Sequence, residues 1–214
     1  MSAADQQHSP EKDAGKTRVF YDTEFRENGV TIDLLSIGIV RETGESYYAV
    51  VSDADWDAVK KDDWLKENVW PGMPVRGLTR EPYSVGGKIK HRVSYPGVLD
   101  TSSSLVKPKW VVANEVRDFL TATPNVELWA WYAAYDHVAL AQLWGRMIGL
   151  PKGIPMWTND LRQEAERLGN PDLPQQDVGE HNALADARHN LVRAQALGLV
   201  PTRVIPPGSD GGAS

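Results

Sequence analysis

Hydrophobic and polar positions over the first fifty residues predict three consecutive strands. Apolar, aromatic and β-branched residues dominate "TRVFYDTEF" (17–25), "VTIDLLSIGIV" (30–40) and "ESYYAVVS" (45–52), which is typical of β-strands. Asn28-Gly29 separates the first two segments, and Thr43-Gly44 separates the last two. Because pairs of this kind form tight reversing turns, the pattern predicts a three-stranded antiparallel meander.

The rest of the chain predicts helices and one buried strand. The expected helices cover residues 53–69, 108–120, 135–147, 160–169 and 181–198, and the expected strand covers residues 126–132. Asp53 or Asp55 is a suitable N-cap for the first helix, and Pro108 lies near the start of the second. Residues 76–107 are rich in Gly, Ser and Pro and predict a long irregular stretch.

This order of elements predicts an α/β fold with a mixed sheet flanked by helices. The ribonuclease H-like architecture has the same order, although a shared fold alone does not define the chemistry. We expect one domain over residues 17–200. Residues 1–16 and 201–214 are polar or rich in Gly and Pro and are expected to form disordered tails.

Composition excludes several kinds of protein. The chain has no cysteine, which excludes disulfides, thiolate metal sites and a cysteine nucleophile, and which suits the reducing cytoplasm. No apolar run approaches the roughly 18 residues that a membrane span needs, and the first residues have no apolar signal segment. The net charge of −6 argues against a protein that coats nucleic acid, but not against an enzyme that binds a few nucleotides.

Candidate chemistry begins with "FYDTEF" (20–25). Asp22 and Glu24 are two positions apart on the first predicted strand, so both carboxylates point to the same face. Like charges held this close repel each other unless a cation lies between them. An exposed pair of acids on the protein surface is the alternative interpretation of these two residues alone.

Two further segments add carboxylates on elements that look buried. Asp136 follows a very apolar strand and lies at the start of a predicted helix, where it could also simply stabilise the helix dipole. His181 and Asp186 are five positions apart in "HNALADAR", and Asp186 lies among alanines that let a helix pack closely. A buried Asp in such a place needs a partner or a ligand.

The full set resembles the DEDDh 3′-to-5′ exonucleases, which carry Asp-x-Glu, a distant Asp and His-x4-Asp. The segments "FYDTEF", "DLLSIGIV", "YYAV", "ELWAWYAAYDHVAL" and "HNALADAR" are more narrowly similar to the actinobacterial ribonuclease AS group. The resemblance covers residues 17–200 and implies a DnaQ-type, ribonuclease H-like fold. The stretch 76–107 and both tails depart from the family pattern.

The resemblance implies a role for each residue of the motif. Asp22, Glu24 and Asp186 would hold one Mg²⁺ or Mn²⁺ ion, and Asp136 would support a second ion near Asp22. Two such ions about 3.5–4 Å apart can stabilise both the attacking and the leaving oxygen of a phosphodiester. His181 would be the general base. A helix-cap role without catalysis is the alternative for His181, and His137 and His189 are expected to be structural or surface residues.

Substrate contacts are expected at three further residues. The resemblance places Thr23 and Phe25 against the terminal nucleotide, where Phe25 could stack on a base or instead belong to the core. Ser36 on the second strand could approach the 3′ end. Residues 76–109 contain seven Lys or Arg against two acids, which indicates either phosphate contacts or a solvated loop.

The sequence therefore predicts a metal-dependent, cytoplasmic 3′-to-5′ exoribonuclease that acts on single-stranded RNA and releases 5′-mononucleotides. The resemblance also implies a preference for adenylate-rich 3′ ends and a homodimer. A proofreading-type DNA exonuclease is the nearest alternative. A non-catalytic nucleic-acid-binding module on the same fold is the alternative from a different class.

Overall fold

A mixed six-stranded sheet forms the centre of the computed structural model, which describes residues 15–176 and 179–201. The strand order is β10-β9-β1-β2-β3-β8. The strands are β1 (Thr17–Glu27), β2 (Ile32–Arg41), β3 (Ser46–Val51), β8 (Val106–Lys107), β9 (Val126–Ala130) and β10 (Asn159–Asp160). β1, β2 and β3 pair antiparallel, whereas β9, β10 and β8 join in parallel. The predicted meander and mixed sheet are confirmed.

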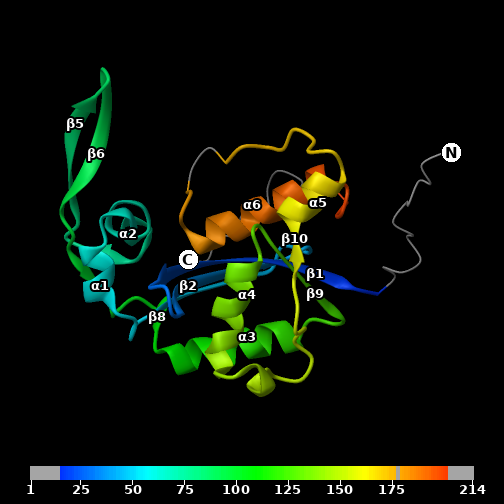
Figure 1. The fold of residues 1–214 in the computed structure, drawn as a ribbon. Coiled ribbons are helices and arrows are strands. Elements are labelled where there is room, and N and C mark those ends of the chain that lie inside the picture. Colours follow the sequence, from blue (N-terminus) through cyan, green and yellow to red (C-terminus); the bar gives the residue numbers. More distant parts are fainter. Residues whose placement is uncertain (1–14, 177–178, 202–214) are drawn as a thin grey trace, which may run out of the picture.

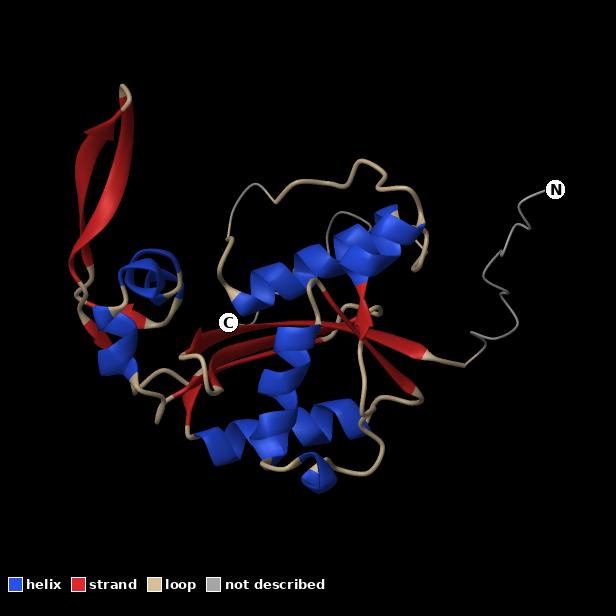
Figure 2. Cartoon of the chain, in the orientation of Figure 1, coloured by secondary structure: helices blue, strands red, loops and turns tan. Residues whose placement is uncertain are grey.

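Helices cover both faces of this sheet (Figure 1, Figure 2). α5 (Leu161–Arg167) and α6 (Ala183–Ala196) lie on one face, and α3 (Lys109–Thr121) and α4 (Ala134–Ala141) lie on the other. Strand β1 contributes side chains to the hydrophobic cores on both faces of the sheet, because its side chains alternate between the faces. Val19 and Tyr21 pack with α3 and α4, while Phe20 packs with Leu161 of α5 and Ala194 of α6.

The predicted helix 53–69 is wrong as a single element. The chain instead forms α1 (Trp56–Lys61), α2 (Asp63–Asn68) and the 3-10 turn η2 (Trp70–Gly72). The break falls at Asp62, whose backbone is extended and whose carboxylate accepts a hydrogen bond from Leu65 N–H at 2.9 Å. An Asp that can cap the following turn competes with a continuous helix.

The predicted irregular stretch 76–107 is also wrong. It contains the two-stranded pair β4 (Val75–Arg76) and β7 (Val98–Leu99), and between them a long hairpin of β5 (Thr79–Val85) and β6 (Lys88–Tyr95). The hairpin extends away from the rest of the domain (Figure 1, Figure 2). Gly86 and Gly87 form its turn with φ values of 57° and 76°, and a Gly-Gly pair with two positive φ angles is a recognised hairpin turn.

Smaller differences lie around α4 and the chain ends. α4 ends at Ala141 instead of residue 147 and is followed by the 3-10 turns η3 (Gln142–Trp144) and η4 (Met147–Gly149), while the short strand β10 was not predicted. The predicted tails fall almost wholly outside the described residues. Within residues 15–176 and 179–201, the helices are too short or too polar to cross a membrane.

Candidate active site

Strand β1 sends its acidic and its neutral site residues to opposite faces of the sheet. Asp22 and Glu24 share the face of Phe20, which packs against α5 and α6. Asp186 of α6 completes the group, and one carboxylate oxygen from each of the three acids lies within 4.8 Å of the others. The paired carboxylates of the sequence motif thus meet the carboxylate of the distant helix.

α6 reaches β1 because β2 carries a glycine beneath it. A Cβ atom on Gly38 would lie 2.3 Å from the carbonyl carbon and oxygen of Ala183, so only glycine permits this contact. Ala183 and Ala187 are fully buried at the same interface. Asn190, one turn after Asp186, donates to Tyr21 C=O at 3.2 Å, which fixes the helix against β1.

Asp136 approaches from the other side of β1. It lies in the first turn of α4, and its Oδ1 atom accepts hydrogen bonds from Thr23 N–H at 2.8 Å and from Thr23 Oγ1 at 2.7 Å. Its side chain is buried. The helix-dipole interpretation therefore describes only part of its surroundings, because Thr23 also ties this carboxylate to the motif strand.

His181 stands directly before the N-cap of α6. Asn182 is the cap and accepts from Ala185 N–H at 3.1 Å, whereas His181 has a left-handed backbone with φ of 64°. Few non-glycine residues adopt this conformation, although histidine does so more readily than most. The His181 ring meets the exposed ring of Trp64 of α2 edge-on, with the centroids 4.9 Å apart.

These residues surround one cavity of about 210 Å³. Its lining comprises Asp22, Thr23, Glu24, Phe25, Trp131, Tyr132, Tyr135, Asp136, His181 and Asp186. The four carboxylates and the imidazole proposed for catalysis all face this space. The cavity is therefore the place where these residues can act together on one ligand.

Electrostatics inside the cavity favour a cationic ligand. Burial is the main cause that raises the pKa of Glu24 to about 8, and the charges of Asp186 and Asp136 add to it. Burial likewise raises the pKa of Asp136 to about 7, although the two hydrogen bonds from Thr23 oppose the rise. The pKa of Asp22 is raised well above its usual range by burial and by the neighbouring acids.

The pKa of Asp186 is raised as well, and burial is again the main cause. Gln176, His181 and Arg193 oppose the increase. Four acids with raised pKa values in one cavity cannot all ionise cheaply without added positive charge. Divalent ions with oxygen ligands would supply that charge, so the donor set fits Mg²⁺ or Mn²⁺.

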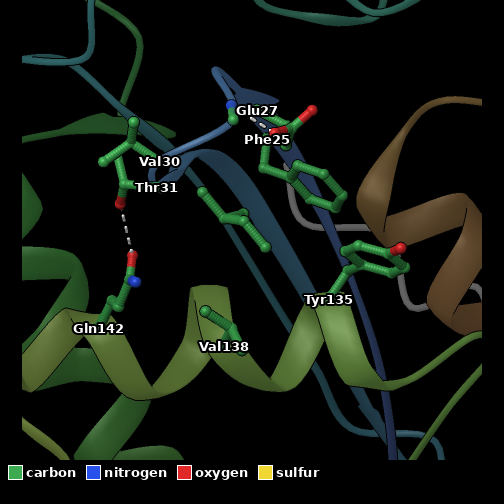
Figure 3. A pocket seen from close by; sticks show the side chains of 9 residues that line it. Phe25, Glu27, Val30, Thr31, Tyr135, Val138 and Gln142 are labelled. Atoms are coloured by element: carbon green, nitrogen blue, oxygen red, sulfur yellow. Dashed lines mark hydrogen bonds between the residues drawn. The ribbon is translucent and has the colours of Figure 1, made fainter.

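A second hollow of about 650 Å³ adjoins the catalytic cavity (Figure 3). The two share Phe25 and Tyr135, whose rings are nearly parallel at 17° with centroids 6.2 Å apart. Val30, Thr31, Val138 and Gln142 continue the second hollow away from the acids. The two aromatic rings therefore form the boundary between the acidic cavity and the second hollow.

The structure brings most of the predicted site residues together. Asp22, Thr23, Glu24, Phe25, Asp136, His181 and Asp186 all line the cavity. Ser36 does not, because it is fully buried on β2 opposite Glu24. His137 and His189 also lie outside the lining, and His189 is buried against Pro174 C=O at 3.1 Å.

Sequence reasoning missed the aromatic part of the site. Trp64, Trp131, Tyr132 and Tyr135 border the catalytic residues. Tyr135 precedes Asp136 directly, so its proximity was available from the sequence. Trp64 lies on a different element, and no local pattern connects it to His181.

The comparisons with known proteins show the family of the chain. The Rv2179c-like 3′-5′ exoribonuclease domain matches residues 97–197. Two proteins of Mycobacterium tuberculosis, 3′-5′ exoribonuclease Rv2179c of strain H37Rv and 3′-5′ exoribonuclease MT2234.1 of strain CDC 1551, are each 38% identical over 182 residues, which is 84% of this chain and 92% of each relative. The chain therefore belongs to the Rv2179c-like 3′-5′ exoribonuclease family.

Proposed function

We propose that this 3′-5′ exoribonuclease is metal-dependent and of the two-ion DEDDh type, with a ribonuclease H-like fold and a ribonuclease AS-like specificity. It would remove 5′-mononucleotides from the 3′ end of single-stranded RNA. The observation that carries the proposal is the convergence of four carboxylates and one imidazole, from three distant segments, in a single cavity.

Each acid has a separate task in this proposal. Asp22, Glu24 and Asp186 would hold one ion, because their oxygens already lie within 4.8 Å of one another. Asp136 would support a second ion beside Asp22 from the opposite side of β1. When bound, such ions neutralise the phosphate and lower the cost of forming a nucleophile from water.

His181 would accept the proton of the attacking water. An imidazole titrates near neutral pH and so can take up and release a proton under working conditions. The left-handed backbone at His181 and the adjoining Trp64 ring restrict where the imidazole can go.

The terminal nucleotide would lie against β1 and α4. Thr23 is fixed by its hydrogen bonds to Asp136, and Phe25 forms the wall between the two hollows together with Tyr135. A base could stack on these rings, and stacking contributes about 1–3 kcal/mol per base. Ser36, buried opposite Glu24, would act only by supporting that neighbour.

The most detailed part of the proposal is the preference for adenylate-rich 3′ ends, which rests on the resemblance to ribonuclease AS. The aromatic lining supports it in one respect, since a purine offers a larger face for stacking than a pyrimidine does. Competition between 3′-terminal A, G, C and U in otherwise identical RNAs tests it. Equal kcat/KM for all four would remove adenylate preference without affecting the mechanism.

The experiment for the mechanism compares three variants that each change one Asp to Asn. Asp22→Asn and Asp186→Asn should lower RNA hydrolysis by at least about 10³-fold, because each removes an ion ligand, while anisotropy should show that RNA still binds. Asp172→Asn, at an exposed position in the loop before α6, is the control. Full hydrolysis by Asp22→Asn would refute the mechanism.

The alternatives have less support. Both relatives are named as exoribonucleases, which supports RNA over DNA, and a binding module would not need five reactive groups in one cavity. A cytoplasmic location remains a prediction from the cysteine-free composition, and a homodimer remains a prediction from the resemblance. Analytical ultracentrifugation of the purified chain tests the dimer, and a single monomeric species would exclude it.

A further inference from the structure

The hairpin β5–β6 has almost no support from the rest of the chain. All residues of β5 and all but Val93 of β6 are exposed, and the ribbon stands clear of the domain (Figure 1). An isolated two-stranded hairpin is marginally stable in water. Its retention as a long arm indicates that something outside the monomer binds it.

One face of the hairpin is strongly basic. β5 and β6 pair so that Tyr83 lies opposite Lys90, Val85 opposite Lys88 and Glu81 opposite Arg92. Residues that face each other across the ladder, and alternate residues along it, share one face. Lys88, Lys90 and Arg92 therefore follow one another on this face at a spacing of about 6.8 Å.

The basic face also carries an aromatic ring and little opposing charge. Glu81 is the acid on this face, and it is paired with Arg92 at 2.6 Å. The Arg92 guanidinium lies 5.9 Å from the centre of the Tyr83 ring. Regularly spaced cations beside an aromatic face suit a strand of phosphates and bases.

Helix α2 connects the hairpin to the acidic cavity. At one end, Trp64 contacts the His181 ring, with centroids 4.9 Å apart. Further along the helix, the Glu67 carboxylate accepts a hydrogen bond from Val93 N–H of β6 at 2.8 Å. A groove of about 1060 Å³ runs between α2 and the hairpin, and its charged lining comprises the cations Lys66, Arg80, Lys90 and Arg92 and the acids Asp63, Glu67 and Glu81.

We propose that the hairpin β5–β6 is an arm that binds the 5′ part of an RNA strand whose 3′ end occupies the catalytic cavity. Lys88 and Lys90 contact phosphates, and Tyr83 supports a base. The inference rests on the proposed function, because it assumes that RNA is the substrate. The regular spacing of the cations on this face favours RNA over a second copy of this chain, because it matches a repeating row of phosphates.

The test uses the double variant Lys88→Ala/Lys90→Ala and a control with the same loss of charge. Arg146→Ala/Lys152→Ala is that control, since both residues are exposed in the segment after α4, away from the hairpin. Binding of a fluorescein-labelled 20-nucleotide RNA is measured by anisotropy between about 50 and 200 mM salt, in the Asp22→Asn background so that the RNA stays intact. Hydrolysis of the 20-mer and of a dinucleotide is measured in the otherwise unchanged enzyme.

We expect Kd for the 20-mer to rise about tenfold at low salt in the hairpin variant. The slope of log K against log salt should become shallower by about 1.4, because each lost phosphate contact on single-stranded nucleic acid contributes about 0.7. The ratio of kcat/KM for the 20-mer to that for the dinucleotide should fall about tenfold. The control should change Kd less than twofold.

Two results would overturn the inference. The first is an unchanged Kd and salt slope in the hairpin variant. The second is an unchanged Kd together with a shift in sedimentation, which would show that the hairpin binds another copy of the chain. Failure of the proposed function looks different, because wild-type protein would then not shorten RNA at all.

Discussion

Replacement of Gly38 by Ala tests whether close packing of α6 on β2 sets the geometry of the site. The added Cβ would lie 2.3 Å from the carbonyl carbon and oxygen of Ala183 and 2.4 Å from Leu184 Cα. Ordinary contact begins at 3.4 Å, so the separation must increase by 3.4 − 2.3 = 1.1 Å. The obstructing atoms are backbone, and no side-chain rotation can relieve the overlap.

This displacement should affect catalysis more than stability. Overpacking of this kind costs about 1–3 kcal/mol, and the smaller entropy of the unfolded Ala chain offsets roughly 0.4–1 kcal/mol of that. A net loss of about 1–2 kcal/mol leaves the protein folded. A displacement of about 1 Å in a reacting group, however, can lower the rate about 100-fold. Such a displacement would affect the site because α6 carries Asp186 and follows His181 in the chain.

The assay pairs urea denaturation with kcat/KM on a labelled RNA at a temperature where both proteins are folded. Gly149→Ala is the matched control, because its Cβ would lie 2.6 Å from the backbone oxygen of Trp144 in η3, outside the lining of the catalytic cavity. We expect the control to lose stability but not activity. Wild-type kcat/KM in Gly38→Ala would refute the idea that this contact positions the catalytic helix.

Three further predictions concern single residues. His181→Asn should lower kcat by about 10²–10⁴-fold and flatten the acidic limb of the pH–rate profile. Mn²⁺ binding should persist, because Asn tolerates the left-handed backbone at this position. An unchanged profile would exclude His181 as the base. Phe25→Ala should raise KM for RNA by about 5- to 150-fold if the ring stacks on a base, and an unaltered KM in a folded variant would place Phe25 in the core only. In EDTA, the free energy of unfolding should fall as pH rises from about 5 to 8. The pKa of Glu24 is raised to about 8 in the folded state, so in this pH range the folded state binds more protons than the unfolded state. Glu24→Gln should reduce that fall by on the order of 3 kcal/mol in urea titrations, whereas an identical pH dependence in the variant would contradict the cause given for the pKa.

The sequence predicted the three-stranded meander of the central sheet because its signals are local. The turns at Asn28-Gly29 and Thr43-Gly44 and the apolar segments around them specify the meander without reference to the rest of the chain. The grouping of the candidate site residues in one cavity was predictable for a different reason. The motif can be found without knowledge of the fold because its residues keep fixed spacings along the chain, Asp22 with Glu24 and His181 with Asp186.

The wrong predictions concern segments whose structure depends on competing local hydrogen bonds or on contacts between residues far apart in the sequence. Asp62 divides the predicted helix because its side chain can cap the next turn, a choice that hydrophobic pattern does not reveal. The richness of residues 76–107 in Gly, Ser and Pro predicts an irregular stretch and conceals the hairpin 79–95, although Gly86-Gly87 marks its turn. Trp64 joins the site only because α2 folds back onto His181.

Degradation of one RNA labelled separately at its 5′ and 3′ ends tests the proposed metal-dependent removal of nucleotides from the 3′ end. With Mg²⁺ or Mn²⁺, the 5′-labelled strand should shorten one nucleotide at a time and the 3′ label should appear at once as mononucleotide. EDTA or Asp186→Asn should stop both. Internal cleavage products, or undiminished shortening in EDTA, would contradict the proposal.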